Sequence, residues 1–120
     1  MANEGYYQKK IIKWFIASGG TAITGMLPTG EADIQAGFPC NGRLLNVMVE
    51  VKTPDNYDRV MRGVEEVDGL YEIVNEKALK EHEPLQIYKV NNVRKRGGLA
   101  LIACCISQVS EYINKELAND

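Results

Sequence analysis

The dipeptide Asn41-Gly42 most restricts how this chain can fold, because it stands between two strand-like stretches. Asn-Gly is the preferred pair for a two-residue hairpin turn, in which both positions need a positive φ angle. Residues 32–37 precede the turn as a short strand, and residues 44–52, rich in Val and Leu, follow it as another. A tight turn determines the register of its two strands, so positions equally far from the turn face each other.

This register brings charged residues of the two strands together. Asp33 is expected opposite Glu50 on one face of the sheet. Further from the turn, Glu31 is expected opposite Lys52 on that same face. Two carboxylates that face each other destabilise a sheet unless a cation lies between them, and oxygen ligands suit Mg²⁺ or Mn²⁺. The register therefore predicts a metal site, with Lys52 beside it to position a water or stabilise a developing negative charge.

A solvated strand face is the alternative interpretation, because Glu and Lys two residues apart often decorate exposed strands. Two features favour the metal site. Val47, Val49 and Val51 alternate with the polar positions, which indicates that the other face of this strand is buried. Glu4 lies on the apolar stripe of a predicted helix over 4–18, where a carboxylate is costly without a partner. Fraying of that helix at its first residues is the alternative for Glu4.

The whole chain predicts an α/β protein, a mixed sheet flanked by helices in the order α-β-β-β-α-α-β-α. The helices are expected over 4–18, 57–81, 84–96 and 108–117, and the strands over 21–26, 32–37, 44–52 and 99–105. Apolar residues from Tyr57 to Ala78 are spaced alternately by three and four, which is typical of a helix-on-helix seam. Gly63 and Gly69 weaken this helix and leave open that it is split. The seam contacts either the protein's own sheet or a second copy.

Composition indicates one globular domain over 1–120. The chain has 45% hydrophobic and 25% charged residues, and 120 residues bury a core without a disulfide or metal staple. The longest apolar stretch, Leu99 to Ile106, is too short to cross a bilayer. Cys40, Cys104 and Cys105 lack a metal-binding spacing and cannot all pair within one chain. These features predict a protein of the reducing cytosol that does not enter a membrane.

Several motifs together resemble a known nuclease family. They are Gly30-Glu31-Ala32-Asp33, Glu50-Val51-Lys52-Thr53-Pro54, Gln86 in a helix that ends at Gly97-Gly98, and Glu4 with Gln8. With them, the chain from Glu4 to its last helix resembles the virus-type replication-repair nuclease (VRR-NUC) family of the PD-(D/E)XK nuclease superfamily. The family commonly has Pro where Ala32 stands, and its linker before the glutamine helix is shorter. Residues 55–83 are therefore interpreted as a helical insertion.

The resemblance implies a restriction-endonuclease-like fold and hydrolysis of DNA phosphodiester bonds with Mg²⁺ or Mn²⁺. The catalytic residues it implies are Asp33, Glu50, Lys52 as the catalytic lysine, Glu4 and Gln86. The metal ligands it implies are Asp33, Glu50, Val51 through its carbonyl, and Glu4, directly or through water. Gln86 is the matching glutamine only if the insertion leaves its helix in place.

The resemblance also implies partners and a source. Stand-alone viral members of the family resemble junction-resolving enzymes and act as dimers. A homodimer acting on branched DNA, such as a Holliday junction in replication or repair, is therefore expected in the cytoplasm, from a phage or prophage. A flap or restriction-type nuclease is one alternative, and a catalytically silent DNA-binding or scaffold domain is another. The intact set of Asp33, Glu50 and Lys52 favours an enzyme.

Charge is distributed unevenly along the chain. The formal net charge of −2 taken alone argues against a nucleic-acid binder. Residues 55–83, however, hold nine of the 16 acidic residues and four of the 14 basic ones, so the remainder of the chain is basic. The residues predicted to contact DNA phosphates are Lys89, Arg94, Lys95 and Arg96 on one helix and its end, and Lys9 and Lys13 on the first helix. A solvated helix face is the alternative for both groups.

Overall fold

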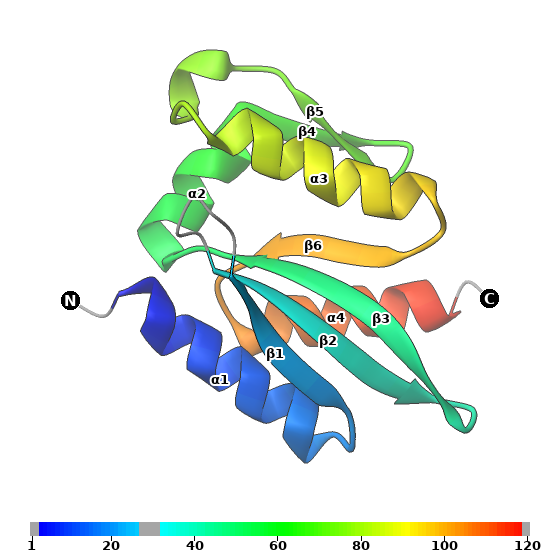
Figure 1. The fold of residues 1–120 in the computed structure, drawn as a ribbon. Helices are drawn as coiled ribbons and strands as arrows, with labels where there is room; N and C mark the ends of the chain where they lie inside the picture. The colour runs from blue at the N-terminus through cyan, green and yellow to red at the C-terminus, as the bar shows by residue number, and fades with distance from the viewer. Residues whose placement is uncertain (1–2, 27–31, 119–120) are drawn as a thin grey trace.

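The computed structural model describes residues 3–26 and 32–118 and shows a compact α/β fold (Figure 1). The helices of these residues are α1 (Glu4–Ala17), α2 (Pro54–Gly63), α3 (Glu83–Lys95), α4 (Ile106–Ala118) and a single 3-10 turn, η1 (Glu76–Ala78). The strands are β1 (Thr21–Met26), β2 (Ala32–Cys40), β3 (Arg43–Val51), β4 (Val64–Val67), β5 (Leu70–Ile73) and β6 (Leu99–Ala103).

One mixed sheet of four strands organises the molecule. Its strand order is β1-β2-β3-β6, in which β1, β2 and β3 are antiparallel neighbours and β6 is parallel to β3. The parallel pairing requires a crossover from β3 to β6, and this crossover contains α2, the small hairpin β4–β5 and α3. The mixed sheet flanked by helices that the sequence predicts is thus present.

The hairpin between β2 and β3 forms around the predicted turn. Asn41 and Gly42 have φ angles of 51° and 81°, as a two-residue turn of this kind requires. The register pairs Asp33 with Glu50 and continues to the pair of Cys40 and Arg43 next to the turn. The predicted register of the two strands is therefore confirmed at the level of the backbone, although β2 is longer than expected.

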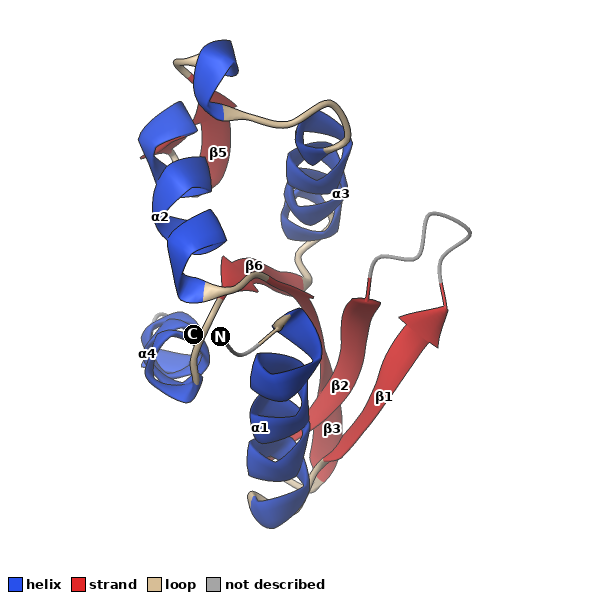
Figure 2. Cartoon of the chain, turned by 90° about the vertical axis from the view of Figure 1, so that its left-hand side faces the viewer, coloured by secondary structure: helices blue, strands red, loops and turns tan. Residues whose placement is uncertain are grey.

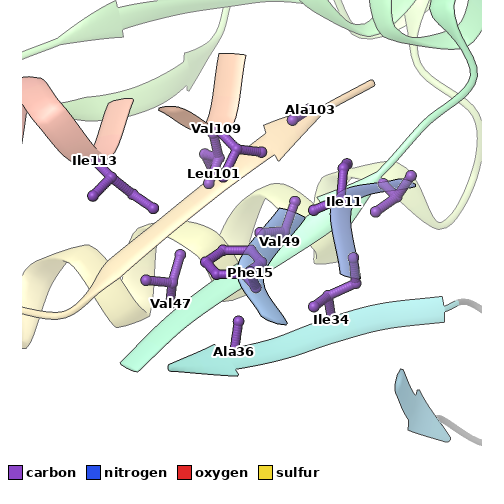
Figure 3. Close-up of a cluster of buried hydrophobic side chains, with 11 residues drawn as sticks. Ile11, Phe15, Ile34, Ala36, Val47, Val49, Leu101, Ala103, Val109 and Ile113 are labelled. Carbon is purple, nitrogen blue, oxygen red and sulfur yellow. The ribbon is translucent and has the colours of Figure 1, made fainter. Parts of the chain in front are cut away.

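Each face of the sheet is covered by its own hydrophobic cluster. On one face, α1 and α4 pack through residues such as Ile11, Phe15 and Ile113 onto the sheet (Figure 3). On the other face, α3 contributes Ile87 and Val90 to a second cluster. Figure 2 shows α2 and α3 on the side of the sheet away from α1 and α4. Alternate residues of β3 therefore point either to α1 and α4 or to α2 and α3.

The helix predicted over 57–81 is wrong beyond Gly63, where α2 ends and the β4–β5 hairpin follows. The two hairpin strands are joined by Asp68 and Gly69, whose φ angles of 52° and 80° are those of a tight hairpin turn. The observed order is therefore α-β-β-β-α-β-β-α-β-α, with η1 before α3. Val64 and Tyr71 of the predicted seam are nevertheless buried against the protein's own sheet.

Candidate active site

The candidate site lies where β3 ends. Glu50 and Lys52 alternate with Val49 and Val51, which belong to the cluster under α1 and α4. Met48, on the same side as Glu50 and Lys52, packs against α3 in the second cluster. Glu50 is 2% exposed and Lys52 is 5% exposed, so both charged side chains are buried on the α3 side of the sheet.

Asp33 is placed by its backbone opposite Glu50, as the turn predicts. The side chain of Asp33 and the whole of Glu31 lie outside the described residues. The expectation that Asp33 shares a face with Glu50, and that Glu31 pairs with Lys52, therefore stays a prediction. Within the described part of the chain, no group of three or more His, Cys, Asp or Glu side chains gathers as a ready metal cage.

The ammonium of Lys52 forms an ion pair with α3. Its Nζ donates a hydrogen bond to Oε2 of Glu83 over 3.2 Å. The side chains are 7% and 2% exposed, so water screens this ion pair little. The backbone N–H of Lys52 also donates to the carbonyl of Ala103 at 2.9 Å, which extends the ladder between β3 and β6 by one residue.

Glu83 accepts three further hydrogen bonds besides the one from Lys52, from two groups. Arg59 on α2 donates from Nη1 to Oε1 at 2.6 Å and from Nη2 to Oε2 at 2.8 Å, a two-pronged contact that matches the carboxylate geometry. The backbone N–H of Lys80 donates to Oε1 at 2.7 Å. Arg59 also donates to the carbonyl of Ala78 at 2.8 Å, so the same guanidinium joins α2, η1 and the start of α3.

Hydrogen bonding keeps Glu83 ionised in spite of its burial. Burial raises the pKa of a carboxyl group, but the donors from Arg59, the Lys80 backbone and Lys52 outweigh it and lower the pKa of Glu83 to about 2. The carboxylate of Glu83 therefore accepts from both the guanidinium of Arg59 and the ammonium of Lys52. Glu50 lies two residues before Lys52, on the same side of the chain at the end of β3.

Three further site candidates sit on the helices beside this end of the sheet. Gln86 is 4% exposed and lies one turn after Glu83, on the buried face of α3. Glu4 is half-buried in the first turn of α1, and Gln8 follows one turn later, 8% exposed. Figure 1 places the first turn of α1 and the first turn of α3 at the same end of the sheet as the end of β3.

The residues predicted to contact DNA do not form one surface. Lys9 and Lys13 are exposed on α1, whereas Lys95 and Arg96 are exposed at the end of α3, across the sheet. Lys89, on α3, is half-buried.

The guanidinium of Arg94 makes its contacts within the protein itself. Its Nε donates to the carbonyl of Ala100 at 2.6 Å, and its guanidinium lies 4.7 Å and 4.8 Å from the ring centres of Tyr71 and Tyr112. It also pairs with Glu66 at 3.2 Å. A cavity of about 680 Å³ beside Arg94 lies at the far end of α3 from Lys52 and so is separate from the candidate site.

Sequence reasoning missed Arg59 and Glu83 as members of the site. An acidic residue directly before Pro84 at the start of a helix is a signal for a helix terminus, and it gives no hint of a lysine 31 residues earlier.

No protein-family model, curated protein or solved structure matches this chain. No helix among residues 3–26 and 32–118 is long and apolar enough to cross a membrane.

Proposed function

We propose that this protein is a metal-dependent DNA endonuclease with a restriction-endonuclease-like fold, as its resemblance to the VRR-NUC family implies. The observation that supports this proposal most is the arrangement of residues at the end of β3. There, the backbone register sets Asp33 opposite Glu50, and a buried, charged Lys52 follows on the same side of the strand as Glu50. A carboxylate pair with an adjacent lysine is the arrangement that this reaction uses.

The donor set fits Mg²⁺ or Mn²⁺. Asp33 and Glu50 offer carboxylate oxygens and Val51 a carbonyl oxygen, and hard divalent cations prefer oxygen ligands. Glu4 would join them directly or through a water. When bound, the metal would supply an activated water and neutralise the charge of the transition state.

The side chains of the chain itself would bind and orient the scissile phosphate. The ammonium of Lys52 lies beside Glu50 and would donate a hydrogen bond to a phosphate oxygen as negative charge develops there. The buried amide of Gln86 would line the site from α3. Lys9 and Lys13 on α1, and Lys89, Lys95 and Arg96 on α3 and its end, would contact phosphates of separate stretches of the DNA.

The substrate that we propose is branched DNA, cut by a homodimer in the cytoplasm of a host cell. Two sites that cut opposed strands of a four-way junction require two-fold symmetry, which a homodimer provides. Analytical ultracentrifugation tests the assembly. A dimer is expected at the concentrations at which cleavage is measured, and a clean monomer there would contradict this part of the proposal.

Cleavage of synthetic DNA tests the proposed reaction. A four-way junction, a flap and a linear duplex are incubated with the protein in Mn²⁺, in Mg²⁺ and in EDTA. The junction is expected to be cut by symmetric nicks in either metal and to stay intact in EDTA. Glu50→Gln and Lys52→Ala should each lower the rate by about 100-fold or more, since each removes a group that acts on the reacting phosphate.

Two exposed residues serve as matched controls, Glu72→Gln for the carboxylate and Lys77→Ala for the lysine. Both are expected to cut at the wild-type rate. Binding of the junction without cleavage in any metal would favour the alternative of a DNA-binding domain. Faster cutting of the flap than of the junction would instead assign the enzyme to the flap nucleases.

A further inference from the structure

The partner of Lys52 within the described residues comes from the long crossover between β3 and β6. Glu83 opens α3, at the end of the 55–83 segment that the resemblance treats as an insertion. A lysine side chain is long and flexible, and a buried polar group needs a hydrogen-bond partner. The contact of 3.2 Å therefore determines where the Nζ of Lys52 lies.

Glu83 does not depend on Lys52 for its own position. Its two oxygens accept from both prongs of Arg59 and from the backbone of Lys80, at distances between 2.6 and 2.8 Å. These bonds are shorter than the 3.2 Å bond from Lys52. Glu83 is thus a fixed anchor to which the lysine attaches, and Arg59 is the residue that holds this anchor in place.

We propose that Glu83 is the positioning residue of the catalytic lysine and that Arg59 acts through it. This inference rests on the proposed nuclease function. Glu83 holds the ammonium of Lys52 on the α3 side of the sheet by accepting from one of its N–H donors, and another donor would bind a phosphate oxygen. The 55–83 segment then contributes to the reaction rate, in addition to covering the core through Val60 and Tyr71.

Steady-state cleavage of the four-way junction in Mn²⁺ tests this role, with Glu83→Gln and Arg59→Lys as the variants. A misplaced reacting group costs catalysis rather than binding, so Glu83→Gln is expected to lower kcat by about 100-fold with KM within about twofold of wild type. Arg59→Lys keeps its charge but loses the fork to Glu83, and it should lower kcat on the order of tenfold.

The double variant shows whether Arg59 acts through Glu83. The kcat of the double variant should equal that of Glu83→Gln alone. Arg59 acts by holding the carboxylate of Glu83, and Glu83→Gln has already removed that carboxylate. Glu81→Gln and Arg62→Lys are the matched controls, since both residues are exposed neighbours on the same segments. Their kcat should equal that of the wild type.

The outcomes separate this inference from the proposed function. A wild type that cuts no substrate overturns both, whereas an active wild type with normal kcat in folded Glu83→Gln overturns the inference alone. A rise of KM at unchanged kcat also contradicts a positioning role. If Glu83→Gln does not fold, Arg59→Lys carries the test, and a folded Arg59→Lys with wild-type kcat overturns the inference.

Discussion

Glu83 is a buried carboxylate between two cations, and its ionisation couples the stability of the protein to pH. Arg59 and Lys52 both donate to it, and its pKa of about 2 lies well below its ordinary value of 4.5. Unfolding releases the carboxylate from these donors, so the unfolded chain takes up a proton at a higher pH than the folded protein does. The contribution of Glu83 to stability is therefore present above pH 4.5 and is lost as the pH falls towards 2.

The free energy of unfolding should consequently fall by about 3 kcal/mol from this one group between pH 4.5 and pH 2. Urea unfolding measured across this range checks the loss. In Glu83→Gln, which has no proton to bind, this part of the pH dependence should be absent, while exposed Glu81→Gln should retain it. Equal pH dependence in the wild type and in Glu83→Gln would contradict the assignment.

Arg94 contributes to stability at the other end of α3. Its guanidinium lies between the rings of Tyr71 and Tyr112 and donates to the backbone of β6. Replacement by Lys keeps the charge but removes the planar group, so Arg94→Lys should lower the free energy of unfolding by about 2 kcal/mol. Urea unfolding should show almost no change for Lys95→Ala, the exposed neighbour. An Arg94→Lys variant as stable as the wild type would contradict this structural role and would favour a role of Arg94 in DNA binding.

The two halves of the site differ in how far the sequence predicts them. The pairing of Asp33 with Glu50 follows from the turn at Asn41-Gly42, because a tight turn determines register locally. The contact between Lys52 and Glu83 depends on how α3 packs over the sheet, with 31 residues between the partners along the chain. Propensity and spacing carry no information on such a contact.

At the scale of elements, the segment after α2 shows where periodicity misleads. Val60, Val64 and Tyr71 face one hydrophobic cluster, whereas Val67 and Val74, which complete the spacings of three and four, are exposed. The spacings of three and four therefore combine core residues with exposed ones, and they do not mark one continuous buried helix face. The Asp68-Gly69 dipeptide was the available signal, because both residues favour the positive φ angles of a hairpin turn.

Gly69→Ala measures the cost of that turn. Gly69 has a φ angle of 80°, and a methyl group added there would meet no atom within 4 Å, so backbone strain is the whole effect. Urea unfolding should show a loss of about 1 kcal/mol. Asp68→Asn, which suits its positive φ equally well, should leave stability unchanged. No loss in Gly69→Ala would contradict the hairpin turn.

At the scale of the whole molecule, both faces of the sheet carry a hydrophobic cluster, and the candidate site lies at one end of the second face. The face under α1 and α4 holds one apolar cluster, and the face under α2 and α3 holds the other and ends in Glu50 and Lys52. The alternation of Val47, Val49 and Val51 predicts this division from the sequence. The acidic 55–83 segment closes over the second face and reaches the site through Glu83.

Anomalous scattering from a crystal soaked in Mn²⁺ tests whether a divalent metal binds at the end of β3. The account predicts one strong peak between the carboxylates of Asp33 and Glu50, within coordination distance of both, and its loss in Glu50→Gln. Glu72→Gln, an exposed carboxylate elsewhere, should keep the peak. The absence of manganese between Asp33 and Glu50, with an ordered Lys52 beside an empty site, would contradict the account.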